Sequence, residues 1–104
     1  DPSNAGAHYV LALCRENAGD QPAAIDRHRR AVYLAPGFSL PRMRLGLLAR
    51  RNGDREGARR ELGQALHLLA AEDAALLRLF GGGFGREALM AMCRAELSAV
   101  GGNT

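Results

Sequence analysis

Apolar residues recur every three or four positions through the first seventy residues of the chain. This spacing places apolar side chains along one face of an amphipathic helix. It predicts four helices, over residues 4–18, 21–35, 39–52 and 55–70. Gly-Asp stands between the members of each pair, at Gly19-Asp20 and Gly53-Asp54. Because glycine can end one helix and aspartate can cap the next, we expect two antiparallel helix pairs.

The two predicted helix pairs have similar sequences at a constant offset of 34 residues. The matched positions are Leu11 and Leu45, Ala12 and Gly46, Gly19 and Gly53, Asp20 and Asp54, Ala24 and Ala58, Ala31 and Ala65, Val32 and Leu66, and Leu34 and Leu68. The small residues would let paired helices approach closely. Larger apolar residues would fill the surrounding core, namely Leu11, Ile25, Val32, Leu45, Leu62 and Leu66. A fixed period of this length indicates a solenoid of stacked helix pairs.

The C-terminal segment is predicted to cover the open end of this stack. A helix over residues 84–99 would place on one side Ala88, Leu89, Met92, Cys93, Leu97 and Val100. We expect it to pack where the first helix of a third pair would lie, and to end at Gly101. Gly81, Gly82, Gly83 and Gly85 would turn the chain before it, with Phe80 and Phe84 as apolar anchors. The preceding stretch, AEDAALLR, fits either a short helix or an extended connector.

The glycine run also matches a phosphate-binding pattern, G-x-G-x-x-A, over residues 83–88. That pattern holds a dinucleotide only between a strand and a helix, with an acidic residue about twenty positions further on. Only nineteen residues follow Gly85, and no strand is predicted before the run. We therefore interpret the glycines as a turn.

The composition of the chain argues against nucleic-acid binding. All fourteen basic residues are arginine, against eleven acidic residues, and seven of them lie between Arg42 and Arg60. Nucleic-acid binding would require interleaved aromatic residues or a recognised motif, which the sequence lacks. We expect instead a solvated basic face that can contact an acidic partner.

The sequence offers few residues that could bind a metal or take part in catalysis. Cys14 and Cys93 have no metal-binding spacing, so we interpret both as core residues of a reduced, cytoplasmic protein and expect no metal site. No nucleophile–base pair or supported carboxylate pair is apparent, so neither catalysis nor a cofactor is expected. No apolar stretch approaches the length of a membrane span and no signal segment is visible. We interpret the sequence, which starts at Asp1, as a fragment of a longer chain.

The 34-residue period, with Leu-Ala/Gly, then Gly-Asp, then Ala and Ala-aliphatic, resembles the tetratricopeptide repeat. The resemblance implies an all-α fold with two helix-turn-helix repeats, about 3–36 and 37–70, forming a fragment of a right-handed superhelix within residues 1–70. A glycine-ending connector over 71–83 and a capping helix with a tail over 84–104 complete the chain. Several positions where the family often has aromatic residues differ here, namely His8, Arg15, His28, Arg42, Ala49 and Leu62.

The tail adds a second resemblance. The segments Leu79–Phe84, Arg86–Leu89 and Cys93–Leu97, following a tetratricopeptide pair, are similar to the C-terminal region of certain bacterial chemotaxis-receptor methyltransferases of the CheR type. Those proteins methylate receptor glutamates with an S-adenosylmethionine-dependent domain, and some append tetratricopeptide repeats. The resemblance implies a module that regulates or localises an attached protein-glutamate methyltransferase. No cofactor-binding or catalytic residue of that family can be placed on this sequence.

Two functions remain open. In the first, a non-catalytic interaction module binds a protein or peptide, with a chemoreceptor or the methyltransferase domain as expected partner, in a concave groove. Its expected lining is Tyr9, Leu13, Glu16, Asn17, Met43, Leu47, Arg50 and Arg51. Arg50 and Arg51 beside an apolar floor suit an acidic helix or peptide, although these residues could instead contact the capping helix or solvent. In the second, the domain is a spacer or a homodimer that associates through Leu40, Met43 or Leu47.

Overall fold

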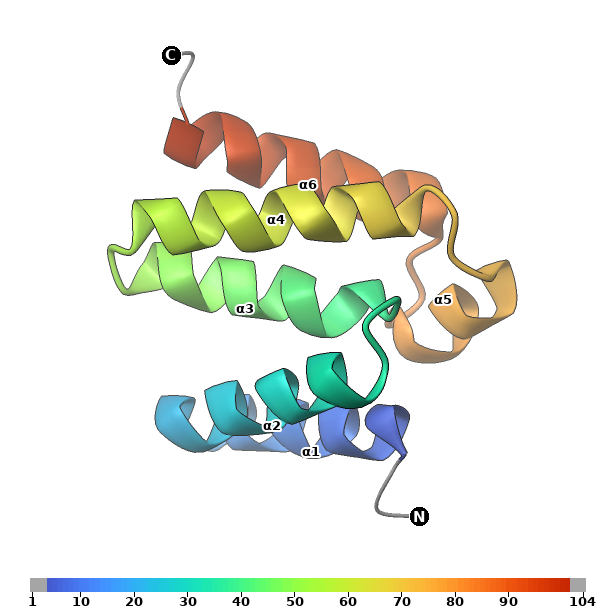
Figure 1. Ribbon diagram of the computed structural model, residues 1–104, viewed down its shortest axis with the longest axis horizontal. Helices are drawn as coiled ribbons and strands as arrows, with labels where there is room; N and C mark the ends of the chain where they lie inside the picture. Colours follow the sequence, from blue (N-terminus) through green and yellow to red (C-terminus); the bar gives the residue numbers. More distant parts are fainter. Residues whose placement is uncertain (1–3, 102–104) are drawn as a thin grey trace.

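The computed structural model describes residues 4–101 of the 104-residue chain, and this range is all-α and without strands (Figure 1). The helices are α1 (Ala5–Asn17), α2 (Gln21–Leu34), α3 (Ser39–Arg51), α4 (Arg55–Leu69), α5 (Ala74–Phe80) and α6 (Arg86–Gly101). The first four confirm the predicted helices to within one residue at each end. Residues 1–3 and 102–104, the outer ends of the predicted segments 1–70 and 84–104, lie outside the described range.

The helices pack in pairs that form a stack. α1 packs against α2 and α3 against α4, while α2 contacts α3 and α6 contacts α4 and, to a lesser extent, α3. Figure 1 shows α5 beyond one end of this stack, near the loop that joins α2 to α3. The C-terminal helix therefore covers the second helix pair, as the apolar stripe predicted.

The 34-residue period of the sequence is also a period of the structure. α1 and α3 begin at residues 5 and 39, and α2 and α4 begin at residues 21 and 55, so both offsets are 34. Gly19 and Gly53 both have a φ of 81°, in the left-handed region that favours glycine. Asp20 and Asp54 each accept a hydrogen bond from the backbone N–H three residues further on, which caps the following helix. The predicted turn chemistry is thus confirmed at both sites.

Small residues bring the paired helices close together. Ala12, Ala24 and Ala58 are fully buried. At the contact between α3 and α4, a Cβ added to Gly46 would lie 2.6 Å from Leu62 Cγ. Leu62 therefore packs directly on the backbone of the facing helix, which a larger residue at position 46 would prevent.

The expectation that Leu11 and Cys14 belong to the core is wrong. Leu11 is 42% exposed, whereas its counterpart Leu45 is 9% exposed, and Cys14 is exposed as well. Leu45 lies beside Ile25 of α2. The corresponding face of α1 is at the outer edge of the stack, where no described helix covers it (Figure 1). Cys93 of α6 is fully buried, as predicted.

The stretch before the glycines forms a short helix, α5. Gly82 and Gly83 then take φ values of 64° and 91°, which residues with a Cβ rarely adopt. The glycine run therefore turns the chain between two helices, as predicted, and follows a helix where a dinucleotide-binding loop would follow a strand.

Two details of the predicted capping segment are wrong. Phe84 is 51% exposed because it lies in the turn before α6, so Phe80 alone acts as an apolar anchor. α6 begins at Arg86, two residues later than predicted, whereas Gly101, where the helix was predicted to end, is its last described residue. Within the predicted stripe, Leu89, Cys93 and Val100 are buried, Leu97 is half-buried, and Ala88 and Met92 are exposed.

Candidate functional site

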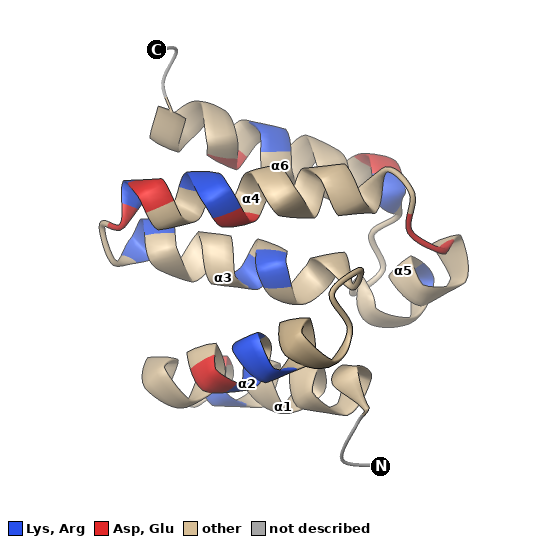
Figure 2. Ribbon diagram, viewed as in Figure 1, with Lys and Arg blue, Asp and Glu red and all other residues tan. Residues whose placement is uncertain are grey.

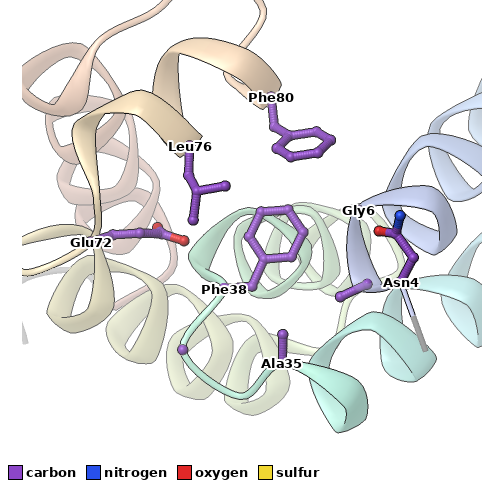
Figure 3. A pocket seen from close by; sticks show the side chains of 9 residues that line it. Asn4, Gly6, Ala35, Phe38, Glu72, Leu76 and Phe80 are labelled. Carbon is purple, nitrogen blue, oxygen red and sulfur yellow. The ribbon is translucent and has the colours of Figure 1, made fainter. Parts of the chain in front are cut away.

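The structure divides the eight predicted groove residues into a covered group and an open group. At the covered end, Tyr9 and Met43 are buried. Phe80 of α5 packs on Tyr9 with ring centroids 6.1 Å apart, and on Phe38 with centroids 5.4 Å apart. Figure 3 shows the Phe80 side chain above that of Phe38. The segment at α5 therefore fills this end of the predicted groove.

The same burial removes the apolar patch expected to mediate self-association. Leu40 and Met43 are buried and Leu47 is half-buried. Leu40 and Met43 belong to the core cluster that also contains Leu77 of α5 and Leu89 of α6, and Leu47 packs against that cluster. The C-terminal helices thus cover the residues that a second copy was expected to contact.

The open end of the groove contains two adjoining hollows near the end of α3. The basic hollow, of about 320 Å³, is lined by Arg44, Leu47, Arg50, Arg51 and Glu96. The apolar hollow, of about 180 Å³, is lined by Met43, Leu47, Leu62, Met92, Cys93, Ala95 and Glu96. Leu47 and Glu96 line both, so the two hollows are neighbours. They place an apolar slot between α3 and α6 beside a rim of arginines.

Arginines on α3 supply this rim (Figure 2). Arg50 is paired with Glu96 of α6, and Arg44 is paired with Glu16 of α1. Arg51 is exposed and forms no ion pair within residues 4–101. Arg51 therefore keeps its full capacity for a carboxylate, and the half-exposed Arg50 could exchange Glu96 for one.

Glu16 lies in a nearly covered network and does not line the open hollows. Its carboxylate accepts a hydrogen bond from His28 Nε2 at 2.7 Å and is paired with the Arg44 guanidinium. Burial raises the pKa of Glu16, but the hydrogen bonds from His28 and Arg44 outweigh burial and lower this pKa to about 2. Since His28 is on α2 and Arg44 on α3, the carboxylate links three helices.

We expect the contribution of Glu16 to stability to disappear in acid. Its folded-state pKa of about 2 lies below the ordinary value of 4.5. The contribution is therefore complete above pH 4.5 and is lost as the pH falls through about 2. The measurement is the free energy of unfolding of the wild-type and Glu16→Gln proteins across this range. Their difference should shrink as the pH falls, and a difference independent of pH would contradict the assignment.

The residues that line the two hollows are only partly those predicted for the groove. Leu13 is half-buried against the core and Asn17 is exposed, and neither lines the two hollows. Arg44, Met92 and Glu96 do line them but were not predicted. Met92 and Glu96 come from α6, and the helical period of α6 does not indicate which of its residues meet α3. The position of Arg44 in the arginine-rich segment was the only signal for it.

Comparisons with family models, with curated proteins and with solved structures each found no match for this chain. Among residues 4–101, His, Cys, Asp and Glu side chains form no group of three or more that could hold a metal ion. Over the same range no helix has the length and apolar character needed to cross a membrane. The candidate site is thus defined by its geometry alone, an apolar slot with an arginine rim.

Proposed function

We propose that the chain is a tetratricopeptide-type module, with two helix-turn-helix repeats in a right-handed arrangement and α6 as a capping helix. The support is the agreement between sequence and structure at the 34-residue offset, where helix starts, left-handed glycines and aspartate caps all recur. The packing of α6 on α4 is what a cap on the last repeat requires.

The module acts without catalysis, by binding a protein or peptide that carries acidic residues. The observation that carries this proposal is that the basic and apolar hollows lie side by side and share Leu47 and Glu96. An amphipathic helix or extended peptide could place an apolar side chain beside Met92 and carboxylates on Arg50 and Arg51. Guanidinium groups favour such carboxylates because they can bind both oxygens at once.

The proposed setting is an attached chemotaxis-receptor methyltransferase, which the module would regulate or localise. The support is the similarity of Leu79–Phe84, Arg86–Leu89 and Cys93–Leu97 to the tails of such proteins. The expected partners are a chemoreceptor or the methyltransferase domain itself. The coding sequence upstream of Asp1 provides a direct test, because a methyltransferase domain there supports the setting and tetratricopeptide repeats alone contradict it.

Reversing the charge of Arg50 and Arg51 is expected to weaken partner binding at least tenfold, since two attractive contacts become repulsive. The measurement is affinity capture from a lysate of the source organism with the wild-type domain and with an Arg50→Glu/Arg51→Glu variant, read by mass spectrometry. Dissociation constants for the captured protein would then be determined for both baits.

The matched control is Arg59→Glu/Arg60→Glu on α4. These two arginines are exposed and outside both hollows, so this variant has the same net charge without altering the site. The proposal expects the control to bind like the wild type. Equal weakening by both variants would show that binding depends on overall charge, and the basic hollow would then not be the site.

A self-association or spacer role is the second candidate, and exposed apolar side chains favour it. Leu76 and Leu79 of α5 and the neighbouring Phe84 are exposed. These residues replace the buried Leu40 and Met43 as the surface that a second copy would contact. Sedimentation of the isolated domain against concentration distinguishes the candidates, because self-association predicts a dimer that a Leu79→Glu substitution abolishes.

A further inference from the structure

A separate pocket lies at the start of α3, whereas the basic hollow lies near the end of that helix. It is enclosed by the start of α1, the loop between α2 and α3, and α5, and it has a volume of about 490 Å³ (Figure 3). Its walls are largely apolar and include Phe38, Leu76 and Phe80. A single acidic side chain, Glu72, interrupts them.

Glu72 is a buried carboxylate without a cation. It is 9% exposed, and within residues 4–101 it forms no ion pair. Ser39 provides all of its hydrogen-bond donors. The Ser39 backbone nitrogen lies 3.3 Å from Glu72 Oε1 and 3.2 Å from Oε2, and the Ser39 hydroxyl donates to Oε1. These bonds cap α3, whose own N-cap residue, Phe38, provides no side-chain cap. The start of α3 offsets part of the negative charge, but no cationic side chain of residues 4–101 lies against the carboxylate and its remaining lone pairs face a largely apolar wall.

The geometry around Glu72 favours an ammonium over a guanidinium. The Ser39 N–H lies at nearly equal distances from the two oxygens, so it occupies the position that a bidentate guanidinium would take. An ammonium is a compact charge and needs only one of the remaining lone pairs. The rings of Phe38 and Phe80 add an attraction for a cation, and the apolar wall suits an aliphatic stem.

We propose that this pocket binds a lysine side chain of a partner protein, with the ammonium against Glu72 and the aliphatic stem along Phe38 and Leu76. The proposal goes beyond the proposed function, because it concerns a different site and a ligand of opposite charge. Residues 1–104 contain no lysine, so none of them could supply this ammonium.

Binding is tested by nuclear magnetic resonance on the whole domain, following the Leu76 methyl groups and the Phe38 and Phe80 rings. The probes are n-butylammonium, which reproduces the lysine side chain, and n-butanol, its neutral analogue. Two blocked tripeptides, Gly-Lys-Gly and Gly-Arg-Gly, complete the set. We expect n-butylammonium to bind about tenfold more tightly than n-butanol, as a charge-assisted hydrogen bond would give. The lysine tripeptide should bind at least as tightly as n-butylammonium, and more tightly than the arginine tripeptide.

Three variants test whether the preference for n-butylammonium arises at Glu72 in this pocket. Glu72→Gln keeps an oxygen for Ser39 but removes the charge, so it should abolish the preference for ammonium over butanol. Glu87→Gln changes the net charge equally at an exposed position outside the pocket and should change nothing. Gly37→Leu adds an apolar side chain at a residue that lines the pocket and should weaken the binding of every probe; a Cβ at Gly37 meets no atom within 4 Å and its φ is ordinary, so the fold should tolerate the change.

The outcomes separate the alternatives. Equal binding of n-butanol and n-butylammonium would show an apolar pocket without cation recognition, and would overturn the proposal. Binding of n-butylammonium but not of the lysine tripeptide would indicate a free amine as the ligand and would also overturn it. If Glu72→Gln fails to fold, Gly37→Leu takes its place, and probe binding that this variant leaves unchanged would overturn the proposal. None of these results depends on whether an acidic partner binds the basic hollow.

Discussion

Replacing Leu62 by alanine is expected to destabilise the domain by about 3 kcal/mol, within the range measured for buried leucines. Leu62 is fully buried on α4 and packs directly on Gly46 of α3, so its removal leaves a cavity at the closest approach of two helices. Glycine at position 46 has no side chain that could move into this cavity. Because domains of this size are stable by only about 5–15 kcal/mol, the loss is a large part of the total.

Urea unfolding measures this effect directly. The control is Leu79→Ala, because Leu79 is 73% exposed and should change the free energy of unfolding by less than about 0.5 kcal/mol. A cost below about 1 kcal/mol for Leu62→Ala would mean that the contact between α3 and α4 is looser than the structure shows.

Within the glycine run, Gly81→Ala is expected to cost about 2–3 kcal/mol, comparable to other cases of overpacking. Gly81 is buried, and a Cβ there would lie 2.7 Å from the Phe84 carbonyl oxygen and closer still to that of Leu77. Both are backbone atoms, so relief would require a shift of the last turn of α5. The Phe80 ring, which fills the end of the groove beside Tyr9, would shift with that turn.

Gly85→Ala is the matched control in the same run. A Cβ at Gly85 meets no atom within 4 Å, and its φ is outside the left-handed region. Alanine there is expected to be neutral, or to stabilise by about 0.4–1 kcal/mol because it restricts the unfolded chain. Thermal unfolding of both variants provides the comparison. Equal effects at the two positions would contradict the turn geometry described here.

The helices and their turns could be predicted because their signals are local. The apolar period, the glycines at positions 19 and 53 and the aspartates that follow them act within a few residues, and the structure confirms each. Because these signals recur with an offset of 34 residues, they also predicted that the helices form two similar pairs. Leu11 was misplaced because burial depends on what packs beside a helix, and this is not encoded in the period of the helix itself.

The site was predictable only in part, because contacts between distant segments decide it. The position of Phe80 against Tyr9 depends on the path of the chain through the glycine run, which sequence patterns do not specify. The network of Glu16, His28 and Arg44 joins three helices, and no spacing rule relates these residues. Arg50 and Arg51 were predicted at the edge of a groove from the period of α3, and both line the basic hollow; whether a partner binds there remains a prediction.

The two proposed sites lie at opposite ends of α3, a helix of 13 residues and therefore about 20 Å long. The basic hollow suits carboxylates and the pocket at Glu72 suits an ammonium, so the two ends present opposite charges to a partner. A partner that engaged both would be oriented by them, because reversing it would place like charges together.

Titration of the isotope-labelled domain with an acidic amphipathic peptide, followed by amide chemical shifts, tests directly whether the basic hollow binds acidic partners. We expect saturable shifts confined to the residues around Leu47, Arg50, Arg51, Met92 and Glu96. These shifts should disappear in the Arg50→Glu/Arg51→Glu variant and persist in the Arg59→Glu/Arg60→Glu variant. Shifts spread over all exposed arginines, or shifts that survive reversal of Arg50 and Arg51, would contradict the basic hollow as a binding site.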